Sequence, residues 1–598
     1  RQRPRPDVPP LQASCRRAAS GADASEAGMR RAEDGAAGSS ETSPASGAAA
    51  WPEPSRSTAP ARDPGELLAG GIFLLAILFA AAVRVRLLDI PLERDEGEYA
   101  YAGQLILKGI APYRLVYNMK LPGTYAAYAL IMALFGQTVR GIHLGFLLVN
   151  AATSWLIYRV TRRLFSSFAA AGAGASYALL SLSPSVLGPF AHATHFVLLP
   201  ALAGLLLLLD AIDDGRAATL LGGGFLLGLG FVMKQHGLFF IALGLLWLMP
   251  RWLRLPLRRV AREAGLFALG AGLPFALTCL TLAACGVFRQ FWFWTFTYAR
   301  VYVSEVPFAD LRRMLPGTLV EIIRPFWPIW LLAAAGTAAL FKEQEYQGRR
   351  YLVTTLLGIS FLSVLPGYYL RQHYFVLLLP AVALSAGVAI DALRRLLRET
   401  GQREIAASAA ALLLLAAGFL ALYPQAPYLL GTTPPELSRF IYGTNPFPEA
   451  VTIGAWLKAR SEPQDQIAVL GSEPEICFYS GLRSATGYIY MYGLMEKQPY
   501  AGRMQQEAIK EIEAAAPRFL VFVNLPESWS WRNDSDRTIL DWFRKYAGAR
   551  YDRVGVTELF ADEETVYTWG RDAATLAPRS PLHIYLYERK TPPPGGSG

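Results

Sequence analysis

Residues 67–102 read LLAGGIFLLAILFAAAVRVRLLDIPLERDEGEYAYA, an unbroken apolar run followed by a cluster of acids. A helix needs about 20 apolar residues to cross the roughly 30 Å hydrocarbon core of a bilayer. The run Leu67–Val83 comes close to that length without a single charge, which is typical of a transmembrane helix. The acids that follow, including Asp95 and Glu96, therefore lie where the chain leaves the membrane.

Similar apolar segments recur along the chain. Its 598 residues are 53% hydrophobic and 17% charged, with a mean hydropathy of +0.26, whereas about a quarter of the residues of a soluble protein are charged. The clearest segments after the first are Ile142–Tyr158, Ala193–Leu209, Leu238–Met249, Ala264–Ala284, Tyr351–Leu365, Val376–Ile390 and Ile405–Leu422. With their flanking residues they predict a polytopic α-helical membrane protein with about eleven transmembrane helices.

Basic residues fall in short clusters between the apolar segments, and their spacing predicts the orientation of the chain. Basic loops face the cytoplasm. Such clusters occupy four of the five alternate turns, at Arg159–Arg163, Arg251–Arg262, Lys342–Arg350 and Arg394–Arg403 but not at Asp210–Arg216. The short loops between these turns carry at most one basic residue each, although the two longer outer loops, Asp89–Thr138 and Gly286–Pro325, carry several. We therefore expect a cytoplasmic N-terminus, with the first outer loop, 89–138, and the C-terminal segment on the extracytoplasmic face. The basic clusters between the spans account for the net charge of +10. The sequence has no basic stripe or motif for binding nucleic acid, so the charge does not indicate a nucleic-acid partner.

The composition also divides the chain into domains. Residues 1–64 are rich in Ala, Ser, Pro and Arg and predict a disordered cytoplasmic tail; we expect a second, flexible tail at 591–598. Residues 65–423 form the predicted transmembrane domain, and 424–590 a small extracytoplasmic α/β domain. In the latter we expect strands at Gln466–Leu470, Arg518–Val523 and Ile584–Tyr587, and helices at Pro446–Lys458, Ala501–Ala515 and Thr538–Tyr546.

The first outer loop concentrates polar and aromatic residues. It reads ERDEGEYAYA at 93–102, GIAPY at 109–113 and YNMKLPGTY at 117–125. A carboxylate at the boundary between water and lipid is partly desolvated, which raises its pKa toward that of a useful general base. The alternative is a solvated loop whose charges face water. The neighbouring aromatic residues and the Lys-x-Pro-Gly turn favour a functional site.

This loop resembles that of the GT-C glycosyltransferases, and more narrowly the bacterial branch related to protein O-mannosyltransferases and aminoarabinose transferases of lipid A. The resemblance rests on Arg-Asp-Glu-Gly-x-Tyr from Arg94, on Pro-Tyr ending at Tyr113, and on Lys-x-Pro-Gly from Lys120. It implies sugar transfer from a polyprenyl-phosphate carrier, with Asp95 as catalytic acid/base, Glu96 supporting it, and Lys120 binding the carrier phosphate. Relatives often have Lys-Pro-Pro where this chain has Lys-Leu-Pro.

Polar residues at other outer ends of the spans are further candidates. An ionisable residue such as Lys234 in an apolar run marks a functional site, although a lysine can also extend to the headgroups. Arg371 suits phosphate binding, with membrane anchoring as the alternative. By the resemblance, relatives often have Lys-Gln at the first position and Arg or His at the second. The predicted donor or acceptor contacts are Tyr99, Tyr113, His192, His195, Gln235 and His373; histidines 192 and 195 also have the commoner, purely structural interpretation.

A cluster of aromatic residues follows in the loop 290–325. Its members are Trp292, Trp294, Tyr298 and Tyr302. Aromatic residues gather at membrane–water interfaces, so we expect an interfacial belt, with a platform for sugar rings as the alternative.

The pattern as a whole favours an inverting membrane glycosyltransferase. The phosphate of a phosphodiester donor departs without a strong general acid, so the reaction needs one carboxylate and cations for the phosphate. We expect no cofactor; Asp95 and Glu96 could hold a divalent metal, but the residues do not require one, and the cysteines lack zinc-like spacing. The expected partners are a polyprenyl-phosphate-linked sugar, a lipid, glycan or protein acceptor, and the bilayer of the inner membrane. The alternatives are a transporter or flippase of a lipid-linked sugar and a non-catalytic glycan-binding envelope protein.

Overall fold

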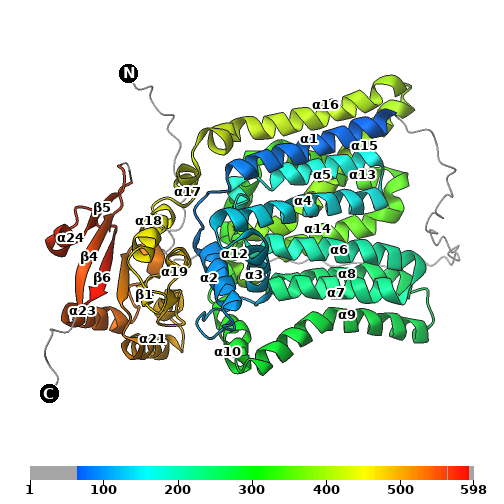
Figure 1. Cartoon of the computed structure of the whole chain (residues 1–598). Helices are drawn as coiled ribbons and strands as arrows, with labels where there is room; N and C mark the ends of the chain where they lie inside the picture. The colour runs from blue at the N-terminus through cyan, green and yellow to red at the C-terminus, as the bar shows by residue number, and fades with distance from the viewer. Residues whose placement is uncertain (1–63, 562, 591–598) are drawn as a thin grey trace, which may run out of the picture. The chain divides into compact units, whose positions relative to one another are not determined.

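The computed structural model describes residues 64–561 and 563–590 (Figure 1). The predicted tails at 1–64 and 591–598 lie outside these residues, apart from Pro64, where the first helix begins. The transmembrane helices and the C-terminal domain belong to one compact unit.

Long apolar helices dominate the first two thirds of the chain. Within the described residues, seven segments are long and apolar enough to cross a membrane. They comprise α1 (Pro64–Arg86), α4 (Val139–Leu164), α6 (Ala193–Asp214), α9 (Leu257–Ala284), the continuous pair α12 (Phe308–Ile323) and α13 (Trp327–Lys342), α15 (Leu379–Glu399) and α16 (Arg403–Leu422). Three shorter apolar helices accompany them, α3 (Gly123–Phe135), α5 (Ser167–Leu180) and α7 (Ala217–Met233). Helices α8 (Leu238–Trp252) and α14 (Arg350–Leu362) complete the bundle. The predicted polytopic helical fold is thus confirmed, while the number of spans stays a prediction.

Glycines let α7 approach α9 closely. A Cβ atom at Gly228 would lie 2.2 Å from the carbonyl oxygen of Ala271, and one at Gly224 would lie 2.4 Å from that of Phe267. Helix association in a bilayer depends on such close backbone packing, because lipid removes the hydrophobic drive between helices. The Gly-rich stretch therefore fixes α7 and, at its end, Lys234.

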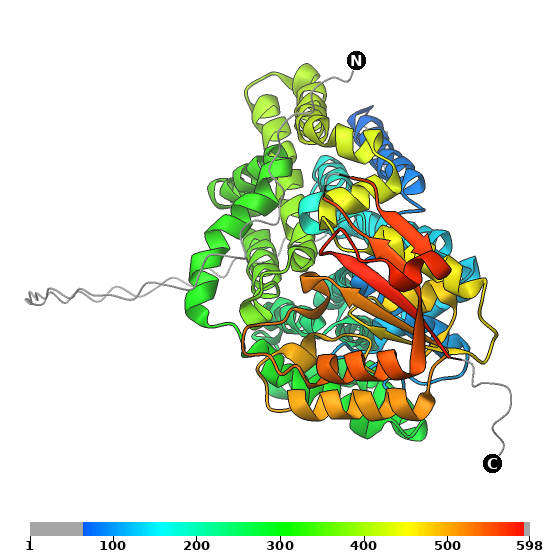
Figure 2. The ribbon, with the colours of Figure 1, turned by 90° about the vertical axis from the view of Figure 1, so that its left-hand side faces the viewer.

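The C-terminal domain is a mixed sheet with helices around it. Within the described residues its six strands run in the order β2-β1-β3-β6-β4-β5, and they face the viewer in Figure 2. The strands are β1 (Gln466–Leu470), β2 (Arg483–Ser484), β3 (Phe519–Asn524), β4 (Tyr551–Glu558), β5 (Val566–Trp569) and β6 (His583–Arg589). The larger helices are α17 (Pro434–Tyr442), α18 (Phe447–Lys458), α19 (Pro474–Ser480), α21 (Ala501–Ala515) and α23 (Thr538–Arg550). The predicted α/β class is confirmed; β2, β4 and β5 are additional strands.

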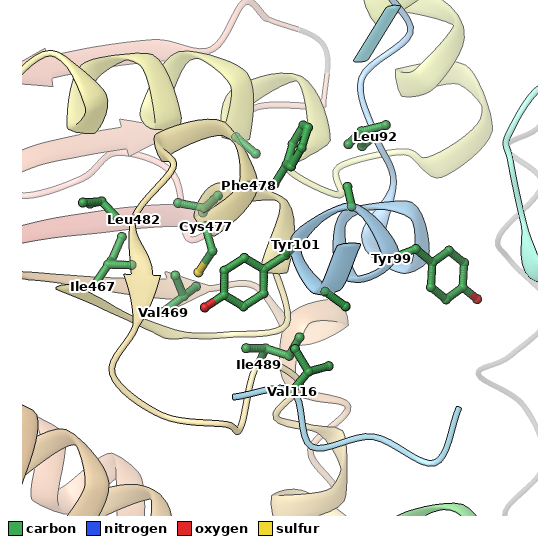
Figure 3. Close-up of a cluster of buried hydrophobic side chains, with 14 of the residues drawn as sticks. Leu92, Tyr99, Tyr101, Val116, Ile467, Val469, Cys477, Phe478, Leu482 and Ile489 are labelled. Atoms are coloured by element: carbon green, nitrogen blue, oxygen red, sulfur yellow. The ribbon is translucent and has the colours of Figure 1, made fainter. Parts of the chain in front are cut away.

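Helix α2 (Arg94–Leu107) lies between the bundle and this domain, packed against α3 on one side and α19 on the other (Figure 1). Its tyrosines point in different directions, Tyr101 toward the strand that contains Val469 and Tyr99 away from it (Figure 3). The Tyr101 hydroxyl accepts a hydrogen bond from the Ser484 amide at 2.8 Å. One hydrophobic core therefore includes α2 and the sheet.

Two of the four residues in the predicted aromatic belt, Trp294 and Tyr298, contact the C-terminal domain, whereas Trp292 is exposed and the belt itself stays a prediction. Trp294 stacks on Tyr117 and packs edge-on against Tyr488 of the C-terminal domain, with ring centroids 5.7 and 5.9 Å apart. The Tyr298 hydroxyl donates to Glu496 at 2.9 Å. Trp294 and Tyr298 are buried, because the C-terminal domain covers them.

Candidate active site

The site begins at the N-terminus of α2, where a capping box fixes the helix start. The Glu93 carboxylate accepts from the Glu96 amide at 2.8 Å, and the Glu96 carboxylate accepts from the Glu93 amide at 3.3 Å. Each bond satisfies a backbone donor that the helix leaves unpaired. The positive end of the helix dipole also favours acids in this turn. Asp95 therefore occupies a rigid position within the first turn.

Asp95 uses its two carboxylate oxygens differently. Oδ1 accepts hydrogen bonds from Lys120 Nζ and from the Tyr490 hydroxyl, both at 2.7 Å. Oδ2 lies 3.9 Å from His192 Nδ1 and accepts no hydrogen bond from the residues that the structure describes. The side chains of Asp95 and Lys120 are about one-fifth exposed, so the pair can be reached from outside.

The expectation that desolvation raises the basicity of Asp95 is wrong for this structure. Burial alone would raise its pKa, but the Lys120 ammonium and the nearby histidines 373 and 192 hold the pKa of Asp95 well below its ordinary value. An adjacent cation favours the ionised form of a carboxyl group. Asp95 is therefore ionised and a weak base as long as Lys120 stays bonded to it.

Glu98 is a site residue that the sequence interpretation missed. Its buried carboxylate accepts from Lys120 Nζ and from Asn118 Nδ2, both at 2.7 Å, and from the Tyr125 hydroxyl. Burial raises the pKa of Glu98, against the opposing effect of Lys120. The signal was present, since residues three apart on a helix share a face. Lys120 thus bridges two carboxylates.

Two predicted contact residues shape the loop that presents Lys120. The Tyr113 hydroxyl donates to the Lys120 carbonyl at 2.7 Å, and Gln235 Nε2 donates to the Met119 carbonyl at 2.7 Å. Tyr113 is buried and has a φ of +66°, a strained conformation that clusters at functional sites. A third predicted residue, Tyr99, places its ring 4.6 Å from Lys120 Nζ. Tyr113 and Gln235 therefore position the lysine.

The other predicted cations, Lys234 and Arg371, lie near Tyr374 beside this site. Lys234 Nζ lies 4.7 Å from the centre of the Tyr374 ring, and Asp95 and Lys120 both act electrostatically on Lys234. Burial lowers the pKa of Lys234 to about 8. Arg371 lies over the ring of Tyr369 at 5.3 Å. Asp95, Lys120 and Arg371 are all within electrostatic reach of Tyr374.

Two histidines complete the cluster. The rings of His192 and His373 stack with their centroids 4.4 Å apart. One ligand-type atom from each of them and one from Asp95 lie within 4.8 Å of one another. Burial lowers the pKa of His192 to about 4, although Asp95 opposes this shift. His192 is therefore neutral at physiological pH and able to accept a hydrogen bond.

Two predicted residues lie outside this arrangement. The Glu96 carboxylate is fully buried and accepts from the Ala191 amide at 2.6 Å, with His143 Nε2 3.2 Å away. His195 is buried against Phe146, with ring centroids 4.8 Å apart. Within the described residues, neither side chain forms a hydrogen bond to Asp95. Their contacts hold neighbouring helices and loops together instead.

Comparison with known proteins gives the same picture. Residues 120–277 match the family model of dolichyl-phosphate-mannose-protein mannosyltransferases. The chain is 28% identical over 397 residues to the undecaprenyl phosphate-α-4-amino-4-deoxy-L-arabinose arabinosyl transferase of Pseudomonas aeruginosa strain UCBPP-PA14, covering 61% of this chain and 66% of that relative. The Pseudomonas paraeruginosa protein matches with the same identity and coverage. The alignment thus spans just under two thirds of these relatives.

The solved structures agree in fold. ArnT from Cupriavidus metallidurans bound to undecaprenyl phosphate gives a TM-score of 0.56 at 16% identity, covering 86% of this chain and 98% of that one. Its apo state gives 0.55 at 17% identity, covering 87% and 98%. The chain therefore shares the fold of ArnT, and the sequence relatives named above are arabinosyl transferases.

Proposed function

We propose that this chain transfers a sugar from a polyprenyl phosphate to a hydroxyl of a lipid, glycan or protein acceptor. The observation that carries the proposal is the pairing of one carboxylate, Asp95, with Lys120 at 2.7 Å, with two further cations, Lys234 and Arg371, near the adjacent Tyr374. Cations suit the donor phosphate, and the carboxylate suits the acceptor hydroxyl. The names of the Pseudomonas relatives support the same donor class.

The donor phosphate binds where the cations meet. Lys120 is already ionised, because Asp95 and Glu98 raise its pKa against the effect of burial. The phosphate competes with these carboxylates for the ammonium group, and Lys234 and Arg371 add further positive charge. As Lys120 turns toward the phosphate, Asp95 loses its closest cation and its pKa rises. Donor binding thereby makes Asp95 a stronger base.

The reaction is a single displacement. The acceptor oxygen forms a bond to the anomeric carbon, and the bond from that carbon to the phosphate oxygen breaks. The polyprenyl phosphate leaves with the electron pair, and the acceptor proton passes to Asp95. Lys120 and its neighbouring cations stabilise the charge on the departing phosphate. One displacement inverts the anomeric centre.

The proposal includes the side of the membrane. Asp95, Lys120, Lys234 and the C-terminal domain lie at one end of the bundle, and the turns with Arg163, Arg251 and Arg395 join helix ends at the other (Figure 1). The positive-inside rule then places the N-terminus in the cytoplasm and the active site on the extracytoplasmic face of the inner membrane.

Reconstitution tests the function directly. The full chain in lipid vesicles is given undecaprenyl phosphate carrying 4-amino-4-deoxy-L-arabinose or another sugar, together with lipid, glycan and protein acceptors. Mass spectrometry should find the sugar on one acceptor class and undecaprenyl phosphate as the second product. Movement of intact donor across the bilayer without loss of its sugar would instead identify a transporter.

We expect transfer to be independent of divalent metal. The Lys120 ammonium already bonds the Asp95 carboxylate and supplies the charge that a metal would bring. Transfer rates measured with and without EDTA should agree within about twofold, since no electrostatic partner is lost. If EDTA abolished transfer and a divalent cation restored it, the site at Asp95, His192 and His373 would hold a catalytic metal.

Deprotonation of Lys234 should weaken binding of the sugar donor at alkaline pH. Its pKa is about 8, so the lysine is charged below pH 8 and neutral above it. The KM for the donor should rise above pH 8, by at most about tenfold per pH unit because one proton is lost. Lys234→Arg should remove this rise, since arginine stays protonated. The donor KM is measured from pH 7 to 9.5 in the wild type and in Lys234→Arg. The same rise in both proteins would contradict the assignment of Lys234 to the donor phosphate.

A further inference from the structure

The C-terminal domain forms hydrogen bonds to α2 directly beside Asp95. Arg94 Nη2 donates to Glu473 at 3.0 Å and to Asn445 Oδ1 at 3.1 Å, and Arg94 Nε donates to the Ser472 carbonyl at 2.5 Å. The Glu473 side chain is completely buried. A buried ion pair offsets the cost of leaving water only when its other donors and acceptors are also hydrogen-bonded. Here the Ser528 hydroxyl donates to the second Glu473 oxygen at 2.6 Å.

A glycine allows the same contact to be close. A Cβ atom at Gly97 would lie 2.6 Å from Cβ of Glu475 at the start of α19. Any larger residue at position 97 would push α2 and α19 apart. The glycine of the Arg-Asp-Glu-Gly motif therefore serves the contact between α2 and the C-terminal domain.

The segment next to this contact brings a tyrosine to Asp95. The Tyr490 hydroxyl donates to Asp95 Oδ1 at 2.7 Å, and the Tyr490 ring lies 5.0 Å from Lys120 Nζ. The following residue is anchored, because the Met491 amide donates to Ser472 Oγ at 2.8 Å. Ser472 thus connects both ends of the arrangement, the arginine before Asp95 and the tyrosine bonded to it.

We propose that the C-terminal domain completes the active site, with Tyr490 as a positioning residue that orients the Asp95 carboxylate toward the acceptor. The inference rests on the proposed function, and it gives the domain a part in the chemistry.

The geometry explains why Asp95 needs a second hydrogen-bond donor besides Lys120. Lys120 and Tyr490 share Oδ1, which leaves Oδ2 as the oxygen for the acceptor proton. When Lys120 turns to the donor phosphate, the Tyr490 hydroxyl remains on Oδ1. A carboxylate with one oxygen fixed cannot rotate freely, and reaction rates depend steeply on such orientation.

Tyr490→Phe tests the proposal with the loss of a single oxygen atom. The assay uses the full chain in vesicles with the undecaprenyl-phosphate-linked sugar that the wild type accepts. We expect kcat to fall about tenfold, as for the loss of one hydrogen bond to a charged group, and the donor KM to stay within twofold. Tyr551→Phe is the matched control, because its buried hydroxyl donates to the Pro517 carbonyl at 2.7 Å, within the same domain but on other elements.

Each outcome has one meaning. A lower kcat in Tyr490→Phe alone, with thermal unfolding like that of Tyr551→Phe, supports the positioning role. An unchanged kcat, or an equal fall in Tyr551→Phe, overturns it. A wild type that transfers no sugar from any donor refutes the proposed function, which is a separate failure from that of the inference.

Discussion

Asp95→Asn should reduce sugar transfer by about a thousandfold, within the range for removing a general base. Asparagine has almost the same shape and keeps an oxygen for the bonds from Lys120 and Tyr490. It cannot accept the acceptor proton. The loss should therefore appear in kcat, while the donor KM should stay the same or fall, because the phosphate no longer competes with the Asp95 carboxylate for Lys120. Initial rates with the donor accepted by the wild type, measured over a range of donor concentrations, separate the two parameters.

The control for this prediction is Asp89→Asn in the same loop. Asp89 pairs with Arg140 at 2.7 Å, but both side chains are more than half exposed, and exposed ion pairs contribute little to stability. We expect wild-type transfer from this variant. Retention of more than a tenth of the wild-type kcat by Asp95→Asn would show that another group is the base.

The sequence could mark Asp95 and Lys120 as candidates because their signal is local, and the structure brings the two side chains together. Both lie in one loop beside one membrane span, and the charged and aromatic residues around them form a recognisable pattern. The helices followed from the apolar runs for the same reason. Glu98 could have been found by its helical spacing from Asp95.

The features of the site that the sequence could not predict depend on contacts between distant parts of the chain. Tyr490 is 395 residues from Asp95 in the sequence, and its segment has no motif that marks it. The sequence gives no distance between Lys120 and Asp95, so it predicted the wrong direction for the pKa of Asp95. The burial of Trp294 and Tyr298 against the C-terminal domain could not be predicted, because their spacing in the sequence does not reveal a covering domain.

Lys120→Met should abolish detectable transfer and also destabilise the protein. The ammonium bonds Asp95 and Glu98 at 2.7 Å each, and the Glu98 side chain is fully buried. Breaking a buried ion pair costs about 3 kcal/mol, because a buried charge is left unpaired. Loss of activity in this variant alone would therefore not separate phosphate binding from folding.

The double variant Lys120→Met, Glu98→Gln separates the two effects. Glutamine removes the buried charge but keeps acceptor and donor groups for Asn118 and Tyr125, so the thermal unfolding temperature should recover most of its loss. Transfer should stay absent, because no ammonium meets the donor phosphate. Lys108→Met, at the exposed position that directly follows α2, should retain both activity and stability. Recovery of transfer in the double variant would mean that Lys120 only neutralises Glu98, and that Lys234 and Arg371 suffice for the phosphate.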